Sequence, residues 1–233
     1  MNRESAKHYG YDYNIPLDEF FQFGISVDCV IFGHHKGKVK VMLIKRGAEP
    51  FKGKWALPGD LVYPNEEIDV AARRVLTELT GLKDIFMNQI RAFGGVERHS
   101  LGRVVTVGYY ASIELDKFSP KPSGWAEDVS WVEINEMPNL AFDHSDIYKE
   151  AKYFLKESLK KTTPQGFELL PEKFTLLQYL QMTEYVLGET IDKANFRKKL
   201  KAIDFLKPLS EMESNVNHRP AKLYTLDKNK INY

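Results

Sequence analysis

Charged residues that could do chemistry recur at helical spacing between residues 55 and 82. Residues three and four apart share one face of a helix, so positions 75, 78 and 79 would face a common site. Carboxylates there could hold Mg²⁺, which requires oxygen ligands. Glu78 offers one, but Val75 and Leu79 offer none. Glu78 is therefore a lone carboxylate beside apolar surface.

This stretch resembles a Nudix box, which reads G, five residues, E, seven residues, then REUxEExGU, where U is bulky and apolar. Gly81 and Leu82 close the pattern and fix its register. The positions that keep the expected type are Glu66, Arg74, Leu76 and Glu78, preceded by Leu57-Pro58-Gly59. The positions that depart from it are Asp60 for the opening glycine, and Val75 and Leu79 for two glutamates.

The resemblance implies a Nudix fold, in which active hydrolases hold Mg²⁺ against a diphosphate through these glutamates. Without the metal, phosphate charge is not neutralised and no water is activated. We therefore predict a protein that is not an enzyme and has no metal or other cofactor. The alternative is an ordinary amphipathic helix of unrelated ancestry.

Length and composition indicate a globular protein of one large or two modest domains. The chain has 233 residues, of which 43% are hydrophobic and 28% charged, with a net charge of +1. Its one cysteine, Cys29, lies in an apolar run and is predicted to be a buried strand residue. No apolar run reaches the ~20 residues that span a membrane, and the N-terminus lacks a signal-peptide core. These features favour a cytoplasmic protein without a membrane partner.

The first part of the chain predicts strands arranged around two helices. The box helix is expected over 66–80, ended by Gly81, and Asp143 is expected to cap a second helix. His34 and His35 are expected in an exposed turn. The predicted strands are 24–32, 39–44, 85–96, 104–115 and 128–134. Together they predict an α/β (α+β) Nudix sandwich of the α/β/α type over residues 1–160.

Candidates for binding a small molecule come from the loops that face the ligand cleft in Nudix proteins. One group follows the second strand and leads into the box, and another lies in the cation-rich loop 97–103. The competing interpretations are surface cations, packing of the tryptophan and a solvated hairpin tip. The predicted effector-binding residues are Arg46, Trp55, Asp60, Glu66, Arg98, His99 and Arg103.

A second domain is predicted over residues 161–233, after a charged, proline-containing linker at 160–166. A helix over 174–187 ends at Gly188, and Asp192 is a good N-cap for a second helix reaching to about residue 206. On that helix Phe196, Leu200 and Ile203 share a face that should be buried. A hairpin-like segment follows. Helix, turn, helix and hairpin predict a winged helix-turn-helix domain.

Positive charge is concentrated in this second domain. From residue 193 to the end there are ten Lys or Arg against four Asp or Glu, a local net charge of +6. This distribution favours double-stranded DNA, with phosphate contacts supplying most of the affinity. A solvated basic face or a protein-binding role is the alternative. The predicted DNA-binding residues are Lys193, Asn195, Arg197, Lys198, Lys201, His218, Arg219 and Lys222.

The order of these features resembles the Nudix-related transcriptional regulators over nearly the whole chain. Besides the box, the segments that carry the resemblance are 142–144 (FDH), 166–171 (GFELLP), 195–199 (NFRKK) and 219–224 (RPAKLY). The resemblance implies a homodimer that binds a DNA operator, as a repressor for example, under the control of a small-molecule effector. The family includes branches responsive to ADP-ribose, which control NAD metabolism, and branches responsive to sugars.

Between these effectors, the residues of the box favour a pentose, such as L-arabinose. The altered metal site removes the reason to expect a diphosphate, and the Asp60 carboxylate can accept sugar hydroxyls but would repel phosphate. An ADP-ribose-sensing regulator, a Nudix hydrolase of ADP-ribose or a nucleotide sugar, and a protein-binding adaptor are the alternatives.

Overall fold

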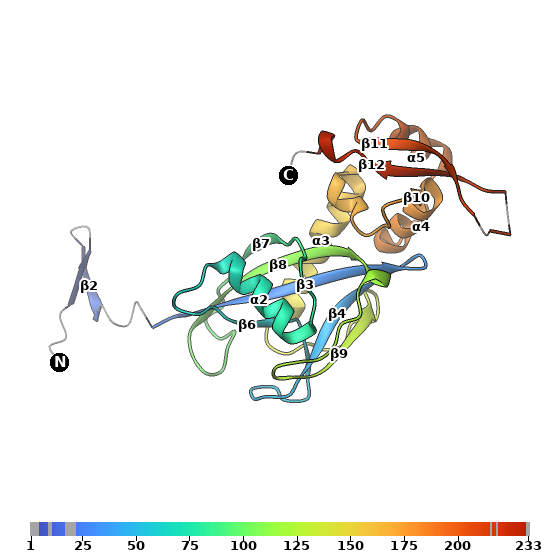
Figure 1. Cartoon of the computed structure of the whole chain (residues 1–233). Coiled ribbons are helices and arrows are strands. Elements are labelled where there is room, and N and C mark those ends of the chain that lie inside the picture. The colour runs from blue at the N-terminus through green and yellow to red at the C-terminus, as the bar shows by residue number, and fades with distance from the viewer. Residues whose placement is uncertain (1–4, 9–10, 17–21, 215, 218, 232–233) are drawn as a thin grey trace.

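The structure is a computed structural model that describes residues 5–8, 11–16, 22–214, 216–217 and 219–231. Strands β1 (Ser5–His8) and β2 (Tyr11–Pro16) pair as a separate hairpin, which stands apart from the rest of the chain (Figure 1). Among the described residues, no helix is long and apolar enough to cross a lipid bilayer.

A mixed sheet forms the centre of the first domain. Strand β3 pairs along its whole length with β8, in parallel, and it pairs antiparallel with β4 and β6. The order across the sheet is β5-β4-β3-β8-β7, with β9 beside β4. The strands are β3 (Gly24–His35), β4 (Lys38–Arg46), β5 (Trp55–Ala56), β6 (Gly59–Leu61), β7 (Asn88–Phe93), β8 (Val104–Glu114) and β9 (Ala126–Glu133).

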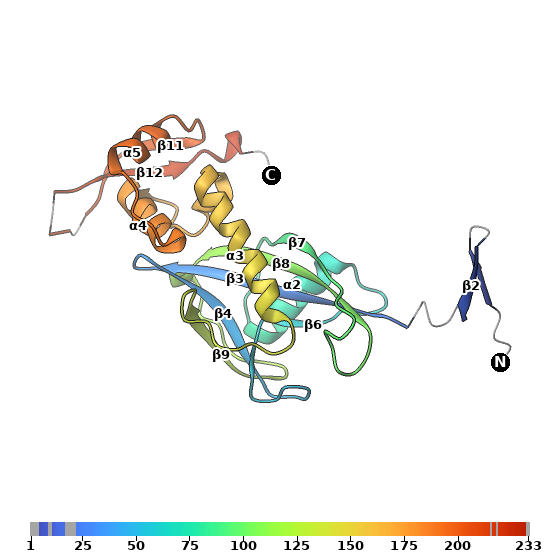
Figure 2. The same cartoon turned by 180° about the vertical axis from the view of Figure 1, so that it is seen from behind.

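Helices α2 (Ile68–Thr80) and α3 (His144–Lys161) cover opposite faces of this sheet (Figures 1 and 2). Successive side chains of a strand point to opposite faces. In β3, accordingly, Cys29 belongs to the apolar cluster under α2, whereas Val30 belongs to the cluster under α3. The predicted α/β/α sandwich is confirmed, as is the burial of Cys29, and Gly81 ends α2 in the left-handed conformation at a φ of 74°.

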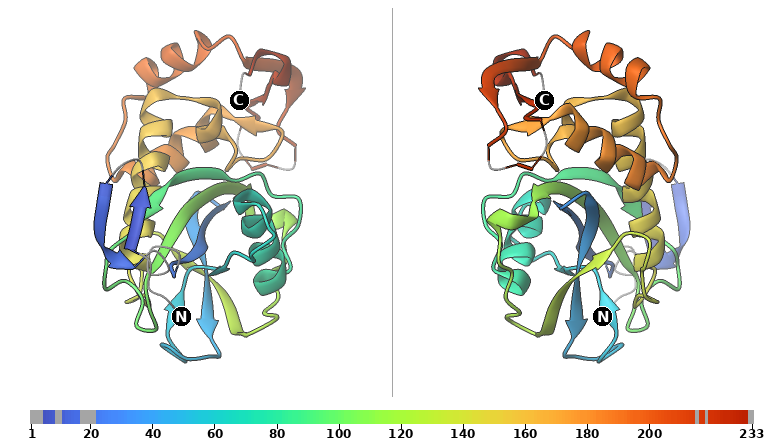
Figure 3. Two further views of the ribbon diagram at one scale, coloured as in Figure 1. Left: turned by 90° about the vertical axis from the view of Figure 1, so that its left-hand side faces the viewer. Right: turned by 90° about the vertical axis from the view of Figure 1, so that its right-hand side faces the viewer.

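The second domain has the predicted winged helix-turn-helix topology. Strands β10 and β11 both pair antiparallel with β12, so that β12 lies in the middle of a small sheet next to the helix pair. Its elements lie together at one end of the sandwich in each view (Figure 3). They are β10 (Phe174–Thr175), α4 (Leu176–Leu187), α5 (Lys193–Lys201), β11 (Leu206–Met212) and β12 (Lys222–Leu226), with short 3-10 helices at η2 (Pro164–Phe167) and η3 (Lys228–Lys230).

The two domains share apolar packing rather than being joined by an open linker. Helix α3 continues to Lys161, and Leu159 in its last turn belongs to the same buried cluster as Phe167 and Tyr179. The rings of Phe167 and Tyr179 stack with centroids 4.0 Å apart and planes 4° apart. The cluster thus extends from the sheet of the first domain to the helices of the second.

Local signals set the ends of the helices in the second domain. Thr175 and Gln178 form a capping box at the start of α4, and Gly188 ends it at a φ of 76°. The Asp192 carboxylate accepts a hydrogen bond from the Asn195 backbone N–H, as predicted. Helix α5 stops at Lys201, earlier than predicted.

Two other sequence predictions were wrong in detail. His34 is buried rather than exposed, because β3 continues to His35 and the His34 ring accepts a hydrogen bond from the Gly37 backbone N–H. Burial lowers the pKa of the His34 imidazole. Strand β7 is shorter than 85–96, since paired glycines follow Phe93 and glycine disfavours strands.

Candidate functional site

The box helix turns two of the three positions at which a Nudix box has glutamates into the core. Val75 and Leu79 are 0% and 2% exposed and pack in the apolar cluster between α2 and the sheet. Arg74 donates to Glu66 at 2.7 Å and to Glu78 at 3.0 Å, so both remaining carboxylates share its charge. These hydrogen bonds hold the pKa of the Glu66 carboxyl below its usual value.

A loop between η1 (Leu115–Lys117) and β9 covers the C-terminal end of this helix. The Lys121 backbone N–H donates to the Thr80 carbonyl at 3.0 Å, and the Ser123 hydroxyl donates to the Glu78 carbonyl. The Trp125 indole N–H donates to the Asp60 carboxylate at 2.9 Å. Among the described residues, no group of three or more His, Cys, Asp or Glu is arranged to hold a metal ion.

A pocket of about 340 Å³ opens between β3, β6, the loop after β4, the loop before β8 and the start of α3. It brings together four of the predicted effector residues, which are Arg46, Asp60, Arg98 and His99. Further residues of its lining are Ser26, Asp28, Glu49, Pro50, Gly59, Leu101, Trp125, Phe142 and His144. The volume lies in the range of ordinary small-molecule sites.

Buried charges form the floor of this pocket. Arg98, whose side chain is only 4% exposed, makes two hydrogen bonds to Asp143, at 2.6 and 2.8 Å, and one to Asp28 at 3.3 Å. Burial alone would raise the pKa of the Asp28 carboxyl, but the facing His144 and Arg98 hold it below its usual value. The floor is therefore a closed network of paired charges.

The segments 57–59 and 142–144 meet at Asp28, where close packing and hydrogen bonds hold them together. A Cβ at Gly59 would overlap the Asp28 carboxylate, so only glycine lets β6 lie against β3 here. His144 accepts the Leu57 backbone N–H at Nδ1, 2.9 Å away, and its Nε2 lies 3.2 Å from Asp28. The 57–59 and 142–144 segments thus build one site.

Aromatic rings hold Arg46 at the mouth of the pocket. Its guanidinium lies 4.7 Å from the ring centroid of Trp125 and 4.9 Å from that of Phe142. Its Nε donates to the Pro50 carbonyl at 2.7 Å. His99 stacks on the other side of Phe142, with centroids 5.1 Å apart. In the described part of the chain Arg46 has no carboxylate within ion-pair distance, although Asp28, Asp60 and Glu49 are near enough to interact with its charge.

The other predicted effector residues lie outside this pocket and have structural contacts. Trp55 pairs through its backbone with β4 and packs against the cluster under α3. Glu66 is bound by Arg74, as described above. Arg103 donates to the carbonyls of Gly94 and Gly95 and braces the loop before β8. Asp143 occupies the N-cap position of α3, but its carboxylate accepts from Arg98 instead of capping the helix.

The second domain presents an exposed cationic helix. Phe196 and Leu200 are buried and Ile203 is partly buried, as predicted, which turns the opposite side of α5 outward. The exposed predicted residues of α5 are Lys193, Asn195, Arg197, Lys198 and Lys201, and those of the β11–β12 hairpin are Arg219 and Lys222. The predicted contact His218 lies outside the described residues.

Sequence reasoning missed the roles of Asp28, His144, Phe142 and Trp125. A signal was available for Asp28, because a carboxylate inside the apolar run 24–32 must find partners once the strand is buried. The aromatic contacts around Arg46 join loops that are distant in the sequence. No local pattern indicates them.

The fold and the site define a class of protein, in which a Nudix sandwich with an altered box precedes a winged helix-turn-helix domain. The NUDIX domain model matches residues 22–151, and the model of the NrtR DNA-binding winged helix domain matches residues 166–226. The chain belongs to the Nudix family, and its pairing of these two domains places it among the Nudix-related transcriptional regulators.

Similar proteins cover both domains. An ADPR responsive transcriptional repressor NtrR of Acinetobacter baylyi is 29% identical over 223 residues, which are 94% of this chain and 85% of the relative. The crystal structure of Shewanella oneidensis NrtR complexed with a 27mer DNA matches with a TM-score of 0.71 and 29% identity, covering 87% of this chain and 93% of that one. The NUDIX domain of the same protein complexed with ADP ribose matches with a TM-score of 0.54 and 30% identity, covering 61% of this chain and 94% of that one.

Proposed function

We propose that this protein is an ADP-ribose-responsive transcriptional repressor. Residues 1–160 sense the effector, and residues 161–233 bind double-stranded DNA. The observation that carries the proposal is Arg46, whose guanidinium contacts two aromatic rings in a pocket and has no carboxylate within ion-pair distance among the described residues. The similarity to the Acinetobacter repressor and to the ADP-ribose complex supports the same effector.

A diphosphate suits this pocket better than a free pentose does. The sequence favoured a pentose because Asp60 would repel phosphate, but the Asp60 carboxylate accepts hydrogen bonds from the Trp125 indole and the Leu61 backbone N–H. These neutral donors orient the Asp60 carboxylate, and the nearby Arg46 guanidinium offsets part of its charge. Arg46 remains as a planar, charged donor, which suits a phosphate group. None of the similar proteins described above supports a pentose or L-arabinose as the effector.

We further propose that the protein is not a hydrolase. The side chains of Val75 and Leu79 contain no oxygen and are buried in the core, so two of the three box positions offer no ligand to Mg²⁺. Mg²⁺-dependent hydrolysis of ADP-ribose by the intact protein, abolished by Glu78→Gln, would contradict this part of the proposal and favour the Nudix hydrolase.

Helix α3 offers a direct route between the two sites. Its first residue, His144, lies in the floor of the pocket, next to Asp143. Near its other end the Lys160 carbonyl accepts a hydrogen bond from Lys199 of α5, at 2.6 Å. We infer that an effector which disturbs the Arg98–Asp143 pair changes the position of α3, and with it the orientation of α5.

Calorimetry on the full chain tests the effector. ADP-ribose should bind, L-arabinose should not, and Arg46→Gln should weaken ADP-ribose binding about tenfold or more, since a hydrogen bond to a charged group is worth roughly 1.5–3 kcal/mol. The ADP-ribose affinity of Arg46→Lys should lie between those of the wild type and Arg46→Gln, because lysine keeps the positive charge but lacks the planar pair of donors of a guanidinium. Lys52→Ala, an exposed lysine of the same loop, is the matched control.

Fluorescence anisotropy on DNA from upstream of the protein's own operon tests the second domain. Binding should weaken steeply with salt, and ADP-ribose should weaken it further. We also propose a homodimer that binds two half-sites, which light scattering of the free and DNA-bound protein would test. Tight operator binding by a monomer would contradict the dimer, and binding indifferent to ADP-ribose would contradict the effector.

A further inference from the structure

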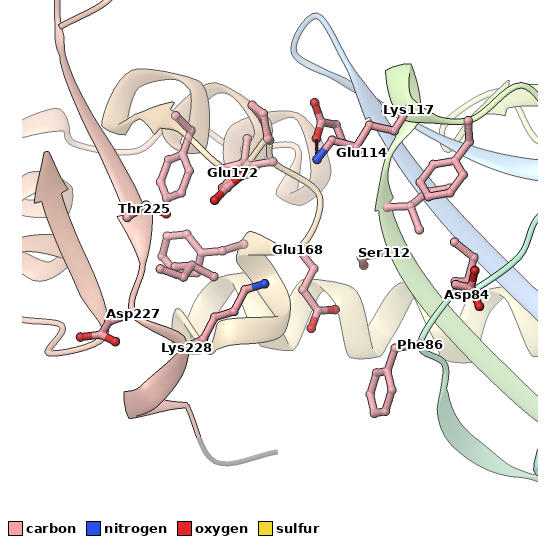
Figure 4. Close-up of a pocket in the computed structure, with 18 of the residues that line it drawn as sticks. Asp84, Phe86, Ser112, Glu114, Lys117, Glu168, Glu172, Thr225, Asp227 and Lys228 are labelled. Atoms are coloured by element: carbon pink, nitrogen blue, oxygen red, sulfur yellow. Dashed lines mark ion pairs between the residues drawn. The ribbon is translucent and has the colours of Figure 1, made fainter. Parts of the chain in front are cut away.

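A second cavity, of about 800 Å³, lies between the two domains. One wall comes from the first domain and includes Asp84, Phe86 and Phe118, and the other comes from η2, β12 and η3. Figure 4 shows Glu168 reaching into the space between these walls, with Phe86 and Asp84 across from it. The cavity shares no lining residue with the pocket that holds Arg46.

Glu168 has no side-chain hydrogen bond or ion pair in the described part of the chain. Burial of its carboxyl raises its pKa to about 7, which reflects the same lack of a compensating charge. Lys228 lines the cavity as well, but it lies outside ion-pair distance of Glu168. Lys117 is already bound to Glu114 at 2.6 Å. A desolvated carboxylate without a partner is costly, so a cation arriving here would be stabilised.

The other charged residues that line the cavity also favour a cation. Carboxylates outnumber cations, since Asp84, Glu114, Glu168, Glu172 and Asp227 face Lys117, Lys207 and Lys228. The aromatic side chains Phe86 and Phe118 also line the cavity, and aromatic rings attract cations. The cavity therefore offers negative charge next to aromatic surface.

We propose that this interdomain cavity binds an organic cation, namely a protonated amine or a guanidinium on an aromatic or aliphatic body, with Glu168 as its counter-charge. A ligand there touches both domains at once. It would bias their relative orientation independently of a ligand in the Arg46 pocket. The proposal does not depend on ADP-ribose being the effector.

A set of probes with one ring and three head groups tests the charge. 2-Phenylethylamine, 2-phenylethanol and 3-phenylpropionate would be titrated into the methyl-labelled full chain and followed by NMR at neutral pH. The amine should bind most tightly, and it should shift the methyl signals of Ile113, Leu170 and Leu226, which line the cavity. Equal affinity of the amine and the alcohol, tighter binding of the carboxylate, or shifts confined to another part of the chain would overturn the proposal.

Two substitutions that should change the affinity for the amine in opposite directions make the test specific. Glu168→Gln should weaken binding of the amine at least fivefold. Lys228→Ala should strengthen it severalfold, because it removes a competing cation. Glu136→Gln, an exposed residue away from the cavity, should change nothing. An unchanged amine affinity in Glu168→Gln would overturn the proposal, and so would a loss in Lys228→Ala. The ADP-ribose affinity of each variant, measured separately, reports on the other pocket.

Discussion

The box helix α2 and the cationic helix α5 are both amphipathic, yet they leave different groups available to a partner. In α2 Val75 and Leu79 are buried, and Glu66 and Glu78 share the charge of Arg74. In α5 the apolar face is equally buried, but the cations Arg197 and Lys198 are exposed. The contrast teaches that a binding face is defined by charges that the fold leaves without partners, rather than by the number of charged residues.

Returning a carboxylate to the box tests the first half of this comparison. Val75→Glu places an ionisable group at a fully buried position, so we expect a loss of about 4–5 kcal/mol in the free energy of unfolding. Urea denaturation would measure it. Val70→Glu, at a position of the same helix that is 45% exposed, should cost less than about 1 kcal/mol. Equal costs would mean that position 75 is open to solvent.

Breaking the floor of the Arg46 pocket should have the next largest effect. Arg98→Met leaves the carboxylates of Asp28 and Asp143 without their shared cation, so we expect a loss of about 3–4 kcal/mol in unfolding free energy. Arg91→Met removes an exposed arginine 3.6 Å from Glu150 and should cost no more than about 1 kcal/mol. Comparable losses in the two variants would show that the network is not strongly coupled.

Glu168→Gln should change stability in a pH-dependent way. Because the folded-state pKa of about 7 lies above the unfolded value, the wild-type protein loses stability as the pH rises from about 4.5 to 7. The glutamine variant lacks this loss, so it should be more stable at pH 8 by about 2 kcal/mol and nearly equal at pH 4.5. Thermal unfolding at several pH values would measure this, and a gain that is the same at every pH would contradict it.

The exposed cations of α5 should give the smallest effects, of about 1 kcal/mol each in DNA binding. Arg197→Ala and Lys198→Ala should each lower the slope of log affinity against log salt by about one, if each contacts a phosphate. Lys52→Ala, an exposed lysine of the first domain, is the control, because Lys199 makes the contact with α3 that we propose couples the two domains. A control that lowers the slope as much as the other two would place the DNA on a different face.

Features decided by neighbours in the sequence were predictable. Gly81, Gly188 and Asp192 set helix ends through local backbone preferences, and the buried face of α5 follows from its periodicity. The pocket was only half predictable. Arg46 and Arg98 were found from their place in the fold, but their partners Trp125 and Asp143 come from distant segments whose meeting depends on tertiary packing.

The choice of effector shows the same limit. The prediction for Asp60 used its charge alone. Its hydrogen-bond donor, Trp125, lies in a loop 65 residues further along the chain. His34 was expected to be exposed because residues 34–37 were predicted to form the turn after the strand. The strand instead continues past it, and the turn is confined to Lys36 and Gly37.

Because α3 runs unbroken from the Arg46 pocket to the second domain, it sets how the second domain is rotated about the helix axis relative to the pocket. Its 18 residues span about 27 Å, so a tilt of about 5° at His144 would move the far end by about 2 Å. One residue inserted in the middle of α3 would rotate everything beyond it by about 100° around the helix axis. In the signalling that we propose through α3, the length of this helix therefore matters as much as any side chain in the pocket.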